Sequence, residues 1–136
     1  MLEKSTGMEK SQKKKILVID DEKEFCQLLK LGLERLGPFE VSTCSSAVQA
    51  IPTIRAVRPH LIFMDIQMPE MSGDEIADLL RADEDLKRVP IVFITAIVTE
   101  NELSGQGNRI GENYCFAKPV KIEELAKVAK KLCGLS

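Results

Sequence analysis

Five polar residues of this 136-residue chain each follow a short apolar run, and their side chains have complementary chemistry. They are Asp20, Asp21, Asp65, Thr95 and Lys118. Three carboxylates brought together repel one another, which a hard divalent cation such as Mg²⁺ can offset. A hydroxyl and an ammonium are the donors needed around a transferring phosphoryl group, and a carboxylate can itself act as the nucleophile. The set therefore predicts phosphoryl transfer onto an aspartate.

The elements that must position these residues are short apolar strands that alternate with segments of helical period. The predicted strands are Ile16–Ile19, Phe39–Cys44, Leu61–Met64, Pro90–Ile94 and Tyr114–Ala117. This α/β pattern predicts a flavodoxin-like, doubly wound (βα)5 fold: a five-stranded parallel sheet of order 2-1-3-4-5 with helices on both faces. The carboxyl ends of parallel strands share one edge, so Asp20, Asp21 and Asp65 should meet in the crevice between strands one and three.

The apolar faces of the helices follow from residues at helical spacing. In the first helix, which Gly37-Pro38 should end, they are Phe25, Leu28, Leu29 and Leu36. In the helix between strands three and four, they are Ile76, Leu79 and Leu80. The last helix is predicted near Ile122–Cys133.

Two segments are less regular. Ser45 or Ser46 should cap the second helix. Pro52 must either kink this helix or lie in its true first turn. Between strands four and five, Gly105, Gly107 and Gly111 weaken any helix, so we expect a short, irregular or mobile connection there.

Composition narrows the class of protein. With 19 basic against 21 acidic residues and 44% hydrophobic residues, the chain should form one domain at 14–136 behind a flexible basic arm at 1–13. No apolar run approaches the roughly 20 residues of a membrane span, and no secretory signal is evident, so we expect no membrane insertion and a cytoplasmic location. The single histidine, His60, excludes multi-histidine metal sites. None of the four cysteines forms a C-x-x-C pair, so redox and zinc motifs are not expected.

Four motifs in order give the chain a resemblance to the receiver domains of two-component response regulators. The matching segments are Val18-Ile19-Asp20-Asp21, Met64 to Pro69 with Met71-Ser72-Gly73, Thr95-Ala96, and Lys118-Pro119. The steps from Asp21 to Asp65, to Thr95 and to Lys118 are 44, 30 and 23 residues. Each motif alone is weak, but the ordered set is specific.

The resemblance implies a role for each matching residue. Asp65 would accept the phosphoryl group from a phosphohistidine on a sensor histidine kinase or a histidine phosphotransfer protein. Asp20 and Asp21 would hold Mg²⁺ (or Mn²⁺), with help from Asp65 and the backbone carbonyl of Gln67. Thr95 and Lys118 would each contact a phosphoryl oxygen.

The same resemblance implies a cis peptide bond before Pro119, and it assigns the conformational switch to Thr95 and to the position of Cys115. The family usually has an aromatic residue where this chain has Cys115. Strand alternation places Tyr114 and Phe116 on the opposite face, so neither is a simple substitute. Gln67 and Ile97 occupy the positions that flank the attacking water, and apolar Ile97 should slow hydrolysis of the phosphorylated state.

The expected protein would catalyse only its own Mg²⁺-dependent phosphorylation and dephosphorylation, and would not otherwise be an enzyme. It would signal to a downstream protein through the face formed by residues 99–135, without binding DNA directly, and a homodimer is left open. Two alternatives remain. One is a phosphatase of the haloacid dehalogenase type, although Gln67 stands where that class has a second acid. The other is a pseudo-receiver that acts only as a docking module, although its acceptor site would be intact.

Overall fold

The computed structural model describes residues 13–96, 108–110 and 113–135. The strands are β1 (Lys14–Ile19), β2 (Phe39–Cys44), β3 (Leu61–Asp65), β4 (Ile91–Thr95), β5 (Asn108–Ile110) and β6 (Asn113–Ala117). The helices are α2 (Lys23–Leu36), α3 (Ala50–Val57), α4 (Gly73–Arg81) and α5 (Ile122–Leu132). None of these helices is long and apolar enough to span a bilayer.

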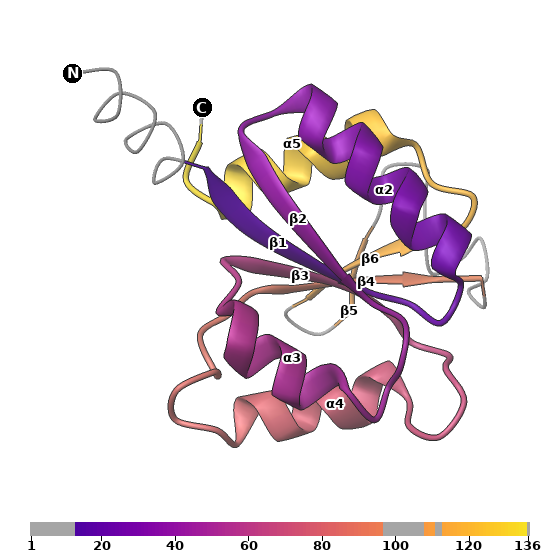
Figure 1. Ribbon diagram of the computed structural model, residues 1–136, viewed down its shortest axis with the longest axis vertical. Helices are drawn as coiled ribbons and strands as arrows, with labels where there is room; N and C mark the ends of the chain where they lie inside the picture. Colours follow the sequence, from indigo (N-terminus) through magenta and orange to yellow (C-terminus); the bar gives the residue numbers. More distant parts are fainter. Residues whose placement is uncertain (1–12, 97–107, 111–112, 136) are drawn as a thin grey trace.

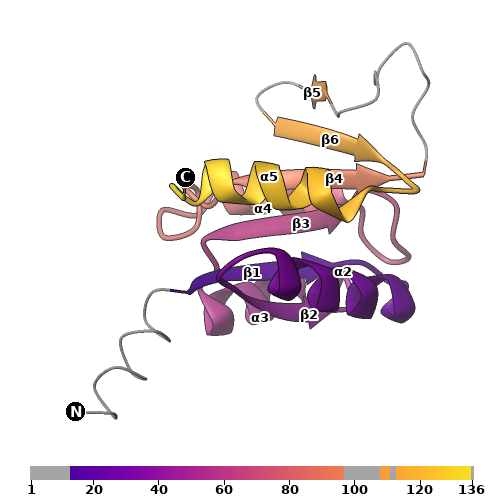
Figure 2. The ribbon, with the colours of Figure 1, turned by 90° about the horizontal axis from the view of Figure 1, so that it is seen from above.

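The strands form one sheet of order β2-β1-β3-β4-β6-β5. β2, β1, β3, β4 and β6 pair in parallel, which confirms the predicted fold and strand order. β5 is an additional short strand that pairs antiparallel with β6 and lies at the end of the sheet opposite β2 (Figure 2). The sequence did not predict β5; its three residues lie within the segment where we expected an irregular connection.

Helices cover both faces of the sheet, with α2 and α5 on one side and α3 and α4 on the other (Figure 1). Alternation along β1 supplies both layers. Ile16 and Val18 pack with the cluster that includes α2 and α5, whereas Leu17 and Ile19 pack with the cluster that includes α3 and α4. Because β1 is apolar at each of these positions, it is buried on both faces, as expected of a central parallel strand.

The buried faces of two helices differ from the prediction. Leu28 is 56% exposed and Leu79 is 49% exposed, so both lie outside the core. In α2 the buried positions are Cys26, Leu29 and Leu33, of which only Leu29 was predicted, while Phe25 and Leu36 are partly buried against the same cluster. Helical spacing gives the direction of an apolar face, but the neighbouring elements decide how much of it is covered.

The second helix also begins later than predicted. α3 starts at Ala50 with Gln49 as its N-cap, so neither Ser45 nor Ser46 caps it. The Ser46 carbonyl instead accepts a hydrogen bond from Gln49 N at 3.2 Å, in a turn that precedes the helix. Pro52 lies in the first turn, where its missing N–H removes no intrahelical hydrogen bond.

The edge strand β2 is held by two side chains of α2. Glu34 Oε2 accepts a hydrogen bond from Val41 N at 3.0 Å, and Lys30 Nζ donates to Val41 O at 2.9 Å. Lys30 also pairs with Glu34 at 3.0 Å. Burial raises the pKa of Glu34, but the Val41 N–H and the Lys30 ammonium outweigh it and lower the pKa overall. We call this group the β2 edge clip.

Candidate functional site

The carboxyl ends of β1, β3, β4 and β6 bring the predicted site residues to one edge of the sheet. Asp20 follows β1, whereas Asp65 and Thr95 are the last residues of β3 and β4, and Lys118 follows β6. Carboxylate oxygens of Asp20, Asp21 and Asp65 all lie within 4.8 Å of one another. Asp20 and Asp65 are buried and Asp21 is exposed, so the cluster opens to solvent on the Asp21 side.

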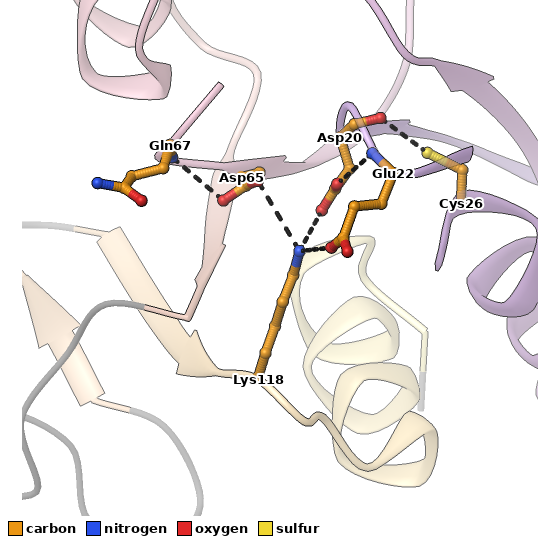
Figure 3. A network of polar contacts seen from close by, with 6 residues as sticks. All are labelled: Asp20, Glu22, Cys26, Asp65, Gln67 and Lys118. Atoms are coloured by element: carbon orange, nitrogen blue, oxygen red, sulfur yellow. Dashed lines mark hydrogen bonds and ion pairs between the residues drawn. The ribbon is translucent and has the colours of Figure 1, made fainter. Parts of the chain in front are cut away.

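The Lys118 ammonium lies among these acids and is closer to Glu22 and Asp20 than to Asp65 (Figure 3). Its Nζ is 2.7 Å from Glu22 Oε1, 2.8 Å from Asp20 Oδ2 and 3.8 Å from Asp65 Oδ2. The ammonium also lies 4.4 Å from the centre of the Phe25 ring, a cation–π distance. The peptide bond between Lys118 and Pro119 is cis, as the resemblance implies.

Backbone donors orient the two buried carboxylates. Asp20 Oδ1 accepts from Glu22 N at 2.9 Å, and Asp65 Oδ1 accepts from Gln67 N at 3.1 Å. The Cys26 thiol donates to the Asp20 carbonyl at 3.2 Å, which ties α2 to the end of β1. In both aspartates Oδ1 is held by the backbone, and Oδ2 is the oxygen that lies closest to the ammonium (Figure 3).

The charges of the site are not balanced by its own residues. Burial raises the pKa of Asp20, and burial together with the Asp20 charge raises the pKa of Asp65 to about 6. Burial would lower the pKa of Lys118, but the neighbouring carboxylates raise it above its usual value. Within the described residues, one ammonium thus faces several carboxylates, two of them buried. Three oxygen donors this close together suit a hard divalent cation.

The loop after β3 is held tightly against the end of that strand. A Cβ atom on Gly73 would lie 2.4 Å from the Asp65 carbonyl oxygen, and Gly73 N donates to Ile66 O at 2.8 Å. Ser72 and Glu75 form a capping box that starts α4 at this point. The Ser72-Gly73 motif therefore fixes the backbone of Asp65 against the start of a helix.

The predicted switch positions lie next to this cluster. Thr95 is buried, and its carbonyl accepts a hydrogen bond from Lys118 N at 2.9 Å. Cys115 is buried on the α3 and α4 side, whereas Phe116 and Tyr114 pack on the α2 and α5 side. The predicted alternation of residues along this strand is therefore confirmed.

Of the positions expected to modulate hydrolysis, Gln67 is exposed beside Asp65. Ile97 lies outside the described residues, as do residues 99–107 of the proposed partner face and residues 1–12 of the N-terminal arm.

The single histidine is remote from the acidic cluster along the strand. His60 immediately precedes β3, at the end opposite Asp65, and its Nδ1 accepts a hydrogen bond from Lys15 N at 2.9 Å. Partial burial and the charges of Lys14 and Lys15 lower its pKa. His60 therefore has a structural role at the end of the strand.

Sequence reasoning missed two residues that contact the site. Glu22 pairs with Lys118, and the thiol of Cys26 binds the Asp20 carbonyl. An acid directly after Asp20-Asp21 was visible in the sequence, but its partner is 96 residues away. The position of Cys26 on the inner face of α2, at the end of its first turn, was the only available signal for the second contact.

Comparisons with known proteins agree with this geometry. The sequence model of the response regulator receiver domain matches residues 16–130. The chain is 30% identical over 124 residues to the polar-differentiation response regulator DivK of Brucella ovis, covering 89% of this chain and 97% of that protein. It is 31% identical over 112 residues to protein RcaC of Microchaete diplosiphon, covering 82% of this chain but only 17% of RcaC.

Solved structures share the fold. The signal receiver domain of a DNA binding response regulator protein from Colwellia psychrerythraea 34H superimposes with a TM-score of 0.76 at 27% identity, over 88% of this chain and 98% of that one. The chemotaxis response regulator CheY4 of Vibrio cholerae gives a TM-score of 0.73 at 25% identity, over 89% of this chain and 99% of that one.

Proposed function

Because this chain belongs to the response regulator receiver domains of two-component signalling, we propose that Asp65 accepts a phosphoryl group from a phosphohistidine. The donor would be a sensor histidine kinase or a histidine phosphotransfer protein. One carboxylate oxygen of Asp65 attacks phosphorus as the P–N bond to the donor imidazole breaks. An acyl phosphate forms, and the imidazole leaves with the bonding electrons and takes up a proton.

The observation that carries this proposal is the placement of the Asp65 carboxylate. Gln67 N holds Oδ1, while Oδ2 faces Lys118 at 3.8 Å and lies within the acidic cluster. With a pKa of about 6, Asp65 is mostly ionised near pH 7 and can act as a nucleophile. The Lys118 ammonium and the Thr95 hydroxyl would each bind an oxygen of the transferred group.

The cofactor of the proposal is Mg²⁺, or Mn²⁺ in its place. Asp20, Asp21 and Asp65 would hold it, together with the backbone carbonyl of Gln67. The close spacing of the three carboxylates and the raised pKa values of Asp20 and Asp65 support a cation at this position. When bound, the cation would supply positive charge against the phosphoryl oxygens.

The phosphodonor would approach along a groove beside the site. This groove, of about 370 Å³, is lined by Phe25, Leu28, Lys118, Pro119 and Val120. The apolar side chain of Leu28 is 56% exposed and belongs to neither core cluster of the described residues, so it is suited to contact with another protein. The same lining brings the partner next to Lys118, whose ammonium would bind an oxygen of the phosphoryl group as it is transferred to Asp65.

Signalling is proposed to follow from rearrangement at Thr95 and Cys115, which is transmitted to a downstream protein through the face formed by residues 99–135. The protein would act in the cytoplasm and would catalyse only its own phosphorylation and dephosphorylation. Gln67 and Ile97 would set the rate of hydrolysis, with Ile97 extending the phosphorylated lifetime. Rapid Mg²⁺-dependent dephosphorylation would contradict this last point.

Incubation with acetyl phosphate and Mg²⁺, followed by intact-mass analysis, tests the function. We expect one added phosphoryl group, which is lost in an Asp65→Ala variant. No addition would favour a docking module without phosphorylation. Steady release of phosphate from many phosphate esters would favour a phosphatase instead.

A further inference from the structure

Glu22 contacts the Lys118 ammonium from a different side than Asp65 does. Its backbone N–H is fixed to Asp20 Oδ1 at 2.9 Å, and its side chain reaches Lys118 Nζ at 2.7 Å. Figure 3 shows Asp65 and Glu22 on different sides of the ammonium, with Asp20 between them. Lys118 is 1.1 Å closer to Glu22 than to Asp65, the difference between 2.7 and 3.8 Å.

We propose that Glu22 is a positioning residue that competes with the phosphoryl group for Lys118. This inference rests on the proposed function of Asp65. A phosphoryl group on Asp65 places new negative charge on the Asp65 side of the ammonium, away from its contact with Glu22. Lys118 lies 3.8 Å from Asp65 and must approach that side to bind the charge, and because Glu22 lies on a different side, this movement weakens the 2.7 Å contact with Glu22.

The two carboxylates that bind Lys118 differ in burial, and this difference indicates which of the two contacts is lost. The Asp20 side chain is 1% exposed, whereas the Glu22 side chain is 63% exposed. Water can replace the ammonium at Glu22 but not at buried Asp20. An exposed ion pair of this kind shifts an equilibrium by roughly two- to five-fold. Glu22 would therefore tune the rate at which the acceptor site is completed without blocking it.

The test compares rates of phosphorylation by acetyl phosphate for wild-type protein, Glu22→Gln, Glu22→Asp and Glu24→Gln. Each variant is measured by intact mass at a Mg²⁺ concentration shown by titration to be saturating. Circular dichroism and the thermal midpoint check folding. Glu24 is the matched control, because it is an exposed glutamate in the first turn of α2, two residues after the N-cap Glu22, and its replacement removes the same unit of charge.

We expect Glu22→Gln to be phosphorylated roughly two- to five-fold faster than wild type, with Glu24→Gln close to wild type. Glu22→Asp should resemble Glu22→Gln, because its charge is kept but its side chain is one methylene shorter. This pattern requires contact with Lys118 and excludes a general charge effect.

The proposal would be overturned by a rate in Glu22→Gln that equals or falls below the wild-type rate. Equal acceleration by Glu24→Gln would also overturn it, as would a wild-type rate in Glu22→Asp. If the wild-type protein gains no phosphoryl group, or if Asp65→Ala still gains one, the proposed function fails and this inference fails with it. Normal phosphorylation on Asp65 with an unaltered Glu22→Gln rate removes only the role of Glu22.

Discussion

Replacing Gly73 with alanine should disturb the backbone of the proposed acceptor residue directly. The added Cβ would lie 2.4 Å from the Asp65 carbonyl oxygen and 3.0 Å from Ile66 Cα. Ordinary contact begins near 3.4 Å, so the carbonyl oxygen must move by about 1 Å. No side-chain rotation can relieve a contact with backbone atoms, and the hydrogen bond from Gly73 N to Ile66 O must stretch as the loop opens.

The cost of Gly73→Ala can be built from these contacts. Overpacking costs about 1–3 kcal/mol, and a weakened backbone hydrogen bond adds about 1 kcal/mol. The lower backbone entropy of alanine in the unfolded chain stabilises the folded protein and offsets about 0.5–1 kcal/mol of this cost. We therefore expect the free energy of unfolding to fall by about 1–3 kcal/mol, which lowers the midpoint of urea unfolding by about 1 M. Phosphorylation should slow by up to about 100-fold, because Asp65 is displaced.

The matched control is Gly32→Ala in the middle of α2. There the new Cβ would meet Cδ1 and Cγ2 of Ile122 at 2.7 and 2.8 Å, and those atoms belong to a side chain that can change rotamer. The higher helix propensity of alanine offsets the adjustment, so stability should change by less than about 1 kcal/mol. An unchanged urea midpoint for Gly73→Ala would refute the reasoning, as would a larger loss for Gly32→Ala.

Three further predictions concern charge and the sheet edge. Burial raises the pKa of Asp65 from 3.8 to about 6, so the metal-free protein should lose stability as the pH rises through 6. In EDTA, the Asp65→Asn variant should have a free energy of unfolding up to about 3 kcal/mol higher than wild type at pH 8, and a smaller gain at pH 5, measured by urea unfolding. Partial burial and the neighbouring lysines lower the pKa of His60, so its contribution to stability is complete above pH 6.5 and is lost at lower pH. The thermal midpoints of His60→Gln and wild type should therefore converge as the pH falls from 7.5 to 5.5. Glu34→Ala leaves Val41 N without its acceptor and should cost about 1–2 kcal/mol in urea unfolding, whereas Glu40→Ala, an exposed change on the same strand, should cost less than about 0.5 kcal/mol.

The strands and the site could be predicted because both depend on the same pattern. Each apolar run ends at the residue that faces the crevice, and parallel pairing places those ends together regardless of how far apart they lie in the sequence. Asp20, Asp65, Thr95 and Lys118 therefore assemble once the strand order is known. The alternation that separates Cys115 from its neighbours follows from the two-residue period of a strand.

The features that escaped prediction depend on contacts that local sequence does not encode. The helical period of α2 and α4 includes Leu28 and Leu79, but no element in the described part of the chain covers them. Ser46 lies in a turn before α3, where its carbonyl binds Gln49 N, and Gln49 is the N-cap of the helix. β5 has only three residues, too few to show a strand pattern. Glu22 meets Lys118 only when folding brings the carboxyl ends of β1 and β6 to the same edge of the sheet.

The β2 edge clip limits the kinds of contact that this side of the sheet can make. Both backbone polar groups of Val41 are bonded to Lys30 and Glu34, so an incoming strand finds neither a donor nor an acceptor at that residue. A peptide could not extend the sheet there by β-augmentation, and neither could a second copy of the chain in a misfolded state. A partner that approaches along β2 must therefore recognise side chains, such as those presented by the neighbouring surface of α2.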